Sequence, residues 1–264
     1  MAQTLNGITE ESEANGYALL LAELGGFDMP EIVPVIELLT SHLVEGIIFA
    51  PPQLLDNVAH IQEQLPAGCP PIVFLKAEPS SAFTTIGIDN YAAARTAVEH
   101  LVALGRRHIG HLAGPLEWRE ARDRRDAWRD AVRDAGLEPG STQAGNWSSA
   151  SGETAFERML AFGTMDGVFA ANDQMALGAL HVANAHGIRI PDDLAVVGFD
   201  GLPESAQFTP SLTTVVQPLG ELGRLAVREL LAHVDDEPEA IAARTVCMPT
   251  ELVIRDSAPA PAGG

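Results

Sequence analysis

The fold of this chain is most directly indicated by residues 167–178, which read Gly-Val-Phe-Ala-Ala-Asn-Asp-Gln-Met-Ala-Leu-Gly. Residues 167–170 form a short apolar run typical of a buried strand. Asn172 and Asp173, which follow it, favour the start of a helix, and helical periodicity continues to residue 186. A strand joined at once to a helix is the repeating unit of a parallel sheet covered by helices.

The same alternation recurs along the chain. Further apolar runs predict strands at residues 17–21, 46–50, 71–75, 108–112 and 195–199. Helical periodicity predicts helices at residues 4–15, 31–43, 53–64, 90–104, 120–135, 151–161 and 220–234. The complete pattern contains about ten strands, which is too many for one compact sheet with all these helices. The sequence therefore predicts an α/β protein with two linked lobes.

Composition narrows the class of protein. The 264 residues include 16 Lys and Arg against 36 Asp and Glu, and the net charge of −20 would repel a nucleic-acid backbone. Cys69 and Cys247 are too few for a disulfide framework or a zinc cluster. Without a signal peptide or a membrane-length apolar run, the chain is expected to be cytoplasmic. The Ala- and Pro-rich tail, residues 257–264, is predicted to be disordered.

Catalytic motifs are absent from the sequence. It has no Gly-x-Ser-x-Gly elbow, no His-Glu-x-x-His, no P-loop, and no Gly-x-Gly-x-x-Gly after a strand. His108 and His111 lie on opposite faces of an extended run, so they are not expected to share a metal. We expect neither an enzyme nor a cofactor or metal site.

Polar residues at strand ends indicate a binding site instead, because α/β sheets bind ligands at the carboxyl ends of their strands. Asn172 follows the run 167–170, Asp200 follows the run 195–199, and Gly114 leads from the run 108–112 into an Arg-rich helix. An amide, a carboxylate and a guanidinium suit a polar, polyhydroxylated small molecule. Trp147 would add a flat apolar wall.

The same residues also suit purely structural roles. Asn172 and Asp173 are both good helix caps, and Asp173 as the cap would leave Asn172 for the ligand. Asp200 followed by Gly201 is a common turn pair. Trp147 suits a hydrophobic core as well as a site. The residues alone leave these alternatives open.

Short strings in a fixed order identify a family. They are Val44-Glu45-Gly46-Ile47-Ile48, Ile88-Asp89-Asn90-Tyr91, Glu99-His100-Leu101, Ala113-Gly114-Pro115, Ala121-Arg122-Asp123-Arg124, Ala170-Ala171-Asn172-Asp173-Gln174-Met175-Ala176-Leu177-Gly178, Val196-Val197-Gly198-Phe199-Asp200 and Leu212-Thr213-Thr214-Val215. Together they resemble the effector-binding core of the lactose-repressor/galactose-repressor family of bacterial transcription regulators. The resemblance covers residues 4–256.

The resemblance implies the fold of periplasmic sugar-binding proteins, in which two doubly wound parallel-sheet lobes are joined by three crossovers and the effector lies in the cleft. One lobe would comprise residues 1–105 and 217–248, the other residues 106–216 and 249–264. The resemblance implies five site residues. Arg124 would bind the effector, Asn172 and Asp200 would form hydrogen bonds with its hydroxyl groups or ring nitrogens, and Trp147 and Leu219 would form apolar walls of the pocket.

The resemblance further implies a homodimer whose effector changes the angle between the lobes. Family members begin with a helix-turn-helix domain and a hinge, and their core begins with an apolar strand. This sequence has neither, so contact with DNA would require an N-terminal domain that it lacks. Either the sequence is a trimmed or misassigned version of a longer protein, or another segment fills the place of that strand.

The favoured prediction is the effector-sensing and dimerisation core of such a regulator, with a sugar as the favoured ligand; a purine or a sugar phosphate remains possible. The alternatives are a solute-binding protein of a sugar transporter, an α/β enzyme, and a chain that inactivates a full-length partner by forming heterodimers. The missing export signal opposes the first alternative, and the missing catalytic pair opposes the second.

Overall fold

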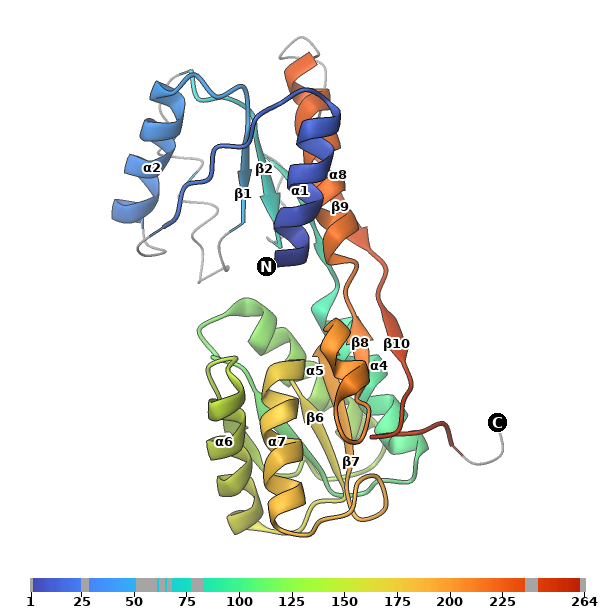
Figure 1. The fold of residues 1–264 in the computed structure, drawn as a ribbon. Coiled ribbons are helices and arrows are strands. Elements are labelled where there is room, and N and C mark those ends of the chain that lie inside the picture. Colours follow the sequence, from blue (N-terminus) through green and yellow to red (C-terminus); the bar gives the residue numbers. More distant parts are fainter. Residues whose placement is uncertain are drawn as a thin grey trace. The chain divides into compact units, whose positions relative to one another are not determined.

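A computed structural model describes residues 2–24, 29–50, 61, 65, 68–76, 83–235 and 242–261. The chain forms two compact units (Figure 1). The first unit contains Met1–Ile88 and Pro218–Pro249, and the second contains Asp89–Gln217 and Thr250–Gly264. Each unit holds one sheet with helices packed on it. The predicted α/β fold with two linked sheets is confirmed.

The division between the units differs from the expected one at its first crossover. Helix α4 (Asn90–Ala103) was expected in the first lobe, but it packs on α5 and on strands of the second unit. A helix joins the sheet that its apolar face covers, and periodicity alone does not reveal which sheet that is. The other crossovers fall at 217/218 and 249/250, where 216/217 and 248/249 were expected.

The first unit is built on a parallel sheet with the strand order β1-β2-β3-β9. Its strands are β1 (Ile47–Phe49), β2 (Ile72–Leu75), β3 (Thr84–Ile88) and β9 (Thr245–Met248). In β2, Val73 and Leu75 pack with residues of α1 (Ala2–Ala14) and α8 (Leu219–Asp235). Ile72 and Phe74 pack with residues of α2 (Met29–Ser41). The strand is therefore buried on both faces, as its continuous apolar sequence predicts.

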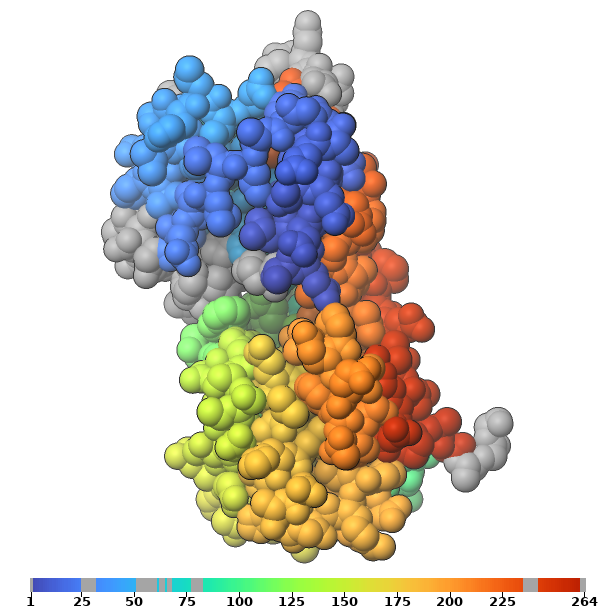
Figure 2. Space-filling view, in the orientation of Figure 1, coloured from blue at the N-terminus to red at the C-terminus, as the bar shows by residue number. Residues whose placement is uncertain are grey.

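Helices α1 and α8 approach each other so closely that only glycine fits between them. A methyl group on Gly7 would overlap the carbonyl oxygen of Gly220, and one on Gly223 would overlap that of Thr4. The atoms of α1 accordingly lie directly against those of α8 (blue and orange in Figure 2). This helix pair covers one face of the first sheet.

One strand prediction in the first unit is wrong. Residues 17–21 form no strand and pair with no described strand, and Leu19, Leu20 and Leu21 are 44%, 50% and 69% exposed. An apolar run becomes a strand only when a neighbouring strand satisfies its backbone hydrogen bonds. The helix predicted at 53–64 lies outside the described residues, apart from the buried, helical Ile61.

The second unit has a sheet of strand order β10-β8-β7-β6-β4-β5. Its strands are β4 (Ile109–Ala113), β5 (Thr142–Ala144), β6 (Gly167–Ala170), β7 (Ala195–Asp200), β8 (Thr213–Val216) and β10 (Glu251–Val253). The strands are parallel except β10, which runs antiparallel to β8. A short 3-10 helix, η1 (Pro203–Gln207), connects β7 to β8.

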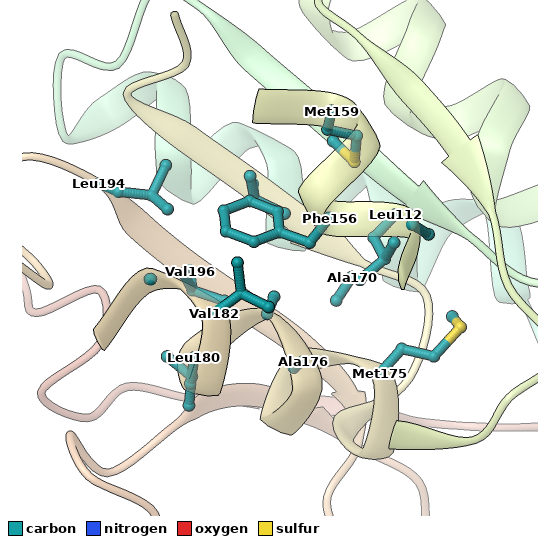
Figure 3. Close-up of a cluster of buried hydrophobic side chains, with 14 of the residues drawn as sticks. Leu112, Phe156, Met159, Ala170, Met175, Ala176, Leu180, Val182, Leu194 and Val196 are labelled. Atoms are coloured by element: carbon teal, nitrogen blue, oxygen red, sulfur yellow. The ribbon is translucent and has the colours of Figure 1, made fainter. Parts of the chain in front are cut away.

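Two helix pairs cover this second sheet. Helix α4 packs with α5 (Arg119–Asp134) on one face, and α6 (Ser149–Phe162) packs with α7 (Asp173–Ala185) on the other (Figure 1). The core beneath α6 and α7 joins Phe156 and Met159 of α6 to Met175 and Val182 of α7 (Figure 3). Because both faces are covered, the strand ends are the part of this sheet that can present polar groups.

The start of the C-terminal tail is ordered, so the predicted disorder of residues 257–264 is wrong for Ser257 and Ala258. Both are fully buried. The Ser257 hydroxyl donates to the carbonyl oxygen of Val196 at 2.6 Å, and the Thr213 hydroxyl donates to that of Ala258 at 2.9 Å. Groups on β7 and β8 thus hold a segment whose composition alone predicts disorder. Residues 262–264 lie outside the described residues.

Candidate effector-binding site

The candidate site lies at the carboxyl edge of the second unit's sheet. Strands β4, β6 and β7 are parallel neighbours, so their carboxyl ends meet at one edge. Arg124 reaches this edge from α5, Asn172 follows β6, and Asp200 ends β7. This is the position at which open α/β sheets hold ligands.

Arg124 is the centre of the site and is only 5% exposed. Its Nε donates to Asn90 Oδ1 at 3.0 Å, its Nη1 donates to the carbonyl oxygen of Ala171 at 2.6 Å, and Nη1 lies 3.5 Å from Asp200 Oδ1. Its Cζ lies 3.7 Å from the ring centroid of Phe199. No hydrogen bond joins Nη2 to any residue that the structure describes.

Asp200 has a backbone conformation that few residues other than glycine adopt. Its φ of 111° is costly for a residue with a Cβ, and such strain is concentrated at functional sites. Gly201 continues the turn with φ 69°, where a Cβ would lie 2.7 Å from Val216 Cα. Asp200 Oδ1 accepts a hydrogen bond from Gln217 Nε2 at 2.7 Å. The turn therefore holds the carboxylate beside Arg124 and does more than reverse the chain.

Asn172 has a double structural role. Its Oδ1 accepts from the backbone N–H of Met175 at 2.9 Å and caps α7, while its Nδ2 donates to the carbonyl oxygen of Trp147 at 3.0 Å. The interpretation that Asp173 is the cap is therefore wrong. An amide has further hydrogen-bonding capacity, so Asn172 keeps one N–H and one lone pair beyond these contacts.

Trp147 is held in place by its neighbours and remains half-buried. Its φ is 73°, and its ring lies against Gly114, where a methyl group would overlap the ring. The Trp118 ring meets it edge-on, with centroids 5.7 Å apart. Arg124 Cζ lies 5.7 Å from its centroid. Trp147 thus forms an aromatic wall next to the guanidinium.

Asp173 fixes the turn that carries Asp200, a role that the sequence did not indicate. The side chain is fully buried; one oxygen accepts from the Thr214 hydroxyl at 2.5 Å and the other from the backbone N–H of Leu202 at 2.8 Å. Burial raises the pKa of this carboxyl group to about 7. The two bonds connect α7 to β8 and to the turn that carries Asp200.

The structure brings four of the five predicted site residues together in the second unit. Leu219 belongs to the first unit, where it begins α8 and is 8% exposed. Sequence reasoning missed the residues that hold Arg124 and Asp200 in place: Asn90, Asp173, Phe199 and Gln217. Asn90 stands just after a strand and Phe199 just before Asp200, so position relative to strand ends could have indicated these two.

Metal-binding clusters and membrane-spanning helices are both absent from the described part of the chain. Its His, Cys, Asp and Glu side chains nowhere gather in a group able to hold a metal ion. Within the same residues, every helix is too short or too polar to cross a membrane.

Comparisons with known proteins show the family to which the chain belongs. A family model described as a periplasmic binding protein-like domain matches residues 98–258. The ribose operon repressor of Halalkalibacterium halodurans is 33% identical over 187 residues, which cover 71% of this chain and 56% of that protein. The HTH-type transcriptional repressor CytR of Escherichia coli is 30% identical over 260 residues, which cover 97% of this chain and 74% of that protein.

A solved structure agrees over nearly the whole chain. The lac repressor dimer bound to operator and the anti-inducer ONPF shares 28% sequence identity with this chain at a TM-score of 0.89, and the match covers 98% of this chain and 89% of that one. The chain spans 56% of the ribose operon repressor, so it corresponds to part of that relative. The chain belongs to the lactose-repressor/galactose-repressor family of transcription regulators and carries a periplasmic binding protein-like domain.

Proposed function

We propose that this chain binds a small polar effector, of the sugar type, at Arg124, Asp200, Asn172 and Trp147, and that binding is coupled to control of transcription without turnover of the ligand. The observation that carries the proposal is the buried Arg124. Its guanidinium is fixed by a ring, an amide and a carboxylate, and Nη2 remains unbonded among the described residues. A guanidinium held in this way loses little freedom when a ligand binds.

The proposed partners are a second copy of the chain and, indirectly, operator DNA. The lac repressor similar to this chain is a dimer bound to its operator. The net charge of −20 disfavours DNA contact by the core itself. A helix-turn-helix domain, as the name of the CytR relative indicates for that protein, would supply the contact. A regulator acting on chromosomal DNA works in the cytoplasm. Leu219 is proposed as a further apolar contact for the effector.

A thermal-shift screen tests the binding step. The panel contains D-ribose, lactose, cellobiose, adenosine and D-ribose 5-phosphate, because a ligand at 100 times its dissociation constant stabilises the folded state by about 2.7 kcal/mol. Each hit is then titrated by calorimetry against the wild type, Arg124→Lys and Asp200→Asn. Loss of one charge-assisted hydrogen bond should weaken binding about 10- to 150-fold.

Arg133→Ala is the matched control, because Arg133 lies on the same helix but is exposed. It should bind like the wild type. Unchanged affinity in both Arg124→Lys and Asp200→Asn would place the ligand away from these residues and reject the proposed site.

A further inference from the structure

Glu120 is a buried acidic residue that none of the contacts described above explains. It lies in the first turn of α5, is 7% exposed, and its Oε2 is fully buried. No hydrogen-bond donor among the described residues reaches Oε2. A buried carboxylate without a donor is costly, and native proteins rarely leave one unpaired.

Glu120 lies on the same side of α5 as Arg124. The two residues are four apart, so they are neighbours on the helix surface, and both belong to the buried side of α5. Burial lowers the pKa of Arg124, and the negative charges of Asp200 and Glu120 partly offset this effect. Because α5 begins beyond the carboxyl end of β4, its first turn lies at the sheet edge that carries the candidate site.

The helix itself does not supply the missing bond. A negative charge near a helix N-terminus is favourable, and this helps Glu120 to remain in the first turn of α5. That interaction is worth only a fraction of a hydrogen bond to a charged group. A donor for Oε2 therefore has to come from outside the described residues, and Arg124, one helical turn away on the buried side of α5, belongs to the candidate site.

We propose that Glu120 is a ligand-binding and specificity-determining residue whose Oε2 accepts a hydrogen bond from the effector. The inference rests on the proposed function of the Arg124 site. Together with Asp200, Glu120 places a second carboxylate near the guanidinium of Arg124. Two acidic acceptors favour a ligand with several hydroxyl donors and repel a ligand with its own negative charge. The effector is therefore a neutral sugar or polyol, and sugar phosphates and sugar acids are excluded.

Matched ligand pairs test this specificity. The probes are D-ribose with D-ribose 5-phosphate, lactose with lactobionate, and cellobiose with cellobionate, each titrated against the wild type, Glu120→Gln and Glu117→Gln. Glutamine keeps the shape of Glu120 but removes its charge. We expect the wild type to bind the neutral member of a pair, and Glu120→Gln to bind it about 10- to 150-fold more weakly.

The preference for the neutral member should also shrink in Glu120→Gln, because the repulsion of anions is lost. Glu117→Gln removes an equal charge from an exposed position just before α5 and should change neither value. Equal affinity of Glu120→Gln and the wild type for the neutral sugar would overturn the inference, as would a wild type that prefers the charged member. Binding lost in Arg124→Lys but kept in Glu120→Gln would leave the proposed function standing.

Thermal unfolding without ligand provides an independent readout. If the partner of Oε2 is the ligand, Glu120→Gln removes a buried charge that has no partner in the free protein. The Tm of the variant should then equal or exceed that of the wild type. If Glu120 instead has an essential structural partner, its Tm should fall by several degrees, and the inference is wrong. A wild type that binds no member of any pair would reject the proposed function, and this inference with it.

Discussion

The guanidinium of Arg124 stacks on the ring of Phe199, with Cζ 3.7 Å from the ring centroid. Phe199 directly precedes Asp200 on β7, so one strand supplies both the ring that orients the guanidinium and the carboxylate that pairs with it. The ring restricts rotation of the guanidinium and is attracted to its charge. Phe199 is therefore a positioning residue for the proposed effector site, although its buried side chain resembles ordinary core.

Phe199→Leu should weaken effector binding. A cation–π contact is worth about 0.5–2 kcal/mol, so the affinity measured by calorimetry should fall about 2- to 30-fold. The control is Phe169→Leu, which removes an equally buried ring that meets Phe199 edge-on. Both variants should lose stability, but only Phe199→Leu should lose affinity. Equal loss of affinity in both would mean that core packing alone is responsible.

Gly114→Ala should displace the aromatic wall. The added methyl group would overlap the Trp147 ring, and the flanking strand β4 leaves the backbone little freedom to move away. Tryptophan fluorescence should therefore change, and effector affinity should fall at least about 10-fold. In Gly220→Ala, the methyl group meets Arg224 at an ordinary 3.6 Å, so this variant should leave the fluorescence unchanged. Wild-type affinity in Gly114→Ala would exclude Trp147 from the site.

Asp173 should make the protein less stable as the pH rises from about 4 to about 7. Burial raises the pKa of this carboxyl group from 3.8 to about 7, so in this range the folded state binds a proton that the unfolded state has lost. The effect amounts to at most about 4 kcal/mol and is complete above pH 7.

Asp173→Asn mimics the protonated acid, since its amide can donate to the Thr214 hydroxyl while its oxygen accepts from Leu202 N–H. Denaturant unfolding should show the variant gaining stability over the wild type as the pH rises from 4 to 8. A constant difference across this range would show that Asp173 is ionised throughout.

His111 should have the opposite pH dependence. It is fully buried between Trp128 and Phe169, its Nδ1 donates to the carbonyl oxygen of Phe169, and burial lowers its pKa from 6.5 to about 4. Below pH 6.5, His111 binds a proton in the unfolded state but stays neutral in the folded state until the pH approaches 4. Stability from this group is thus present above pH 6.5 and is lost as the pH falls to about 4, by up to about 3 kcal/mol.

His111→Asn keeps an N–H at the position of Nδ1 but cannot titrate. It should be less stable than the wild type at pH 7, because the stacked ring is lost, and the difference should narrow toward pH 4. Unfolding curves of both proteins at matched pH values measure this difference. If the gap stays constant, the imidazole titrates normally in the folded state.

The amino-acid sequence by itself determined the α/β class, the two linked sheets and the gathering of Arg124, Asn172, Asp200 and Trp147 in one unit. These follow from local rules: apolar runs form buried strands, and the carboxyl ends of parallel strands meet at one edge. Asn172 and Asp200 stand at such strand ends, whereas Arg124 lies on α5 and was singled out by the resemblance to the family.

Only the tertiary structure decided which sheet α4 covers, that residues 17–21 form no strand, and that Asn172 caps α7 while Asp173 supports the turn of Asp200. It also revealed the ring beneath Arg124 and the unpaired oxygen of Glu120. Each of these depends on a partner distant in sequence. Periodicity and spacing describe one segment at a time, whereas burial and hydrogen bonding depend on which segments meet.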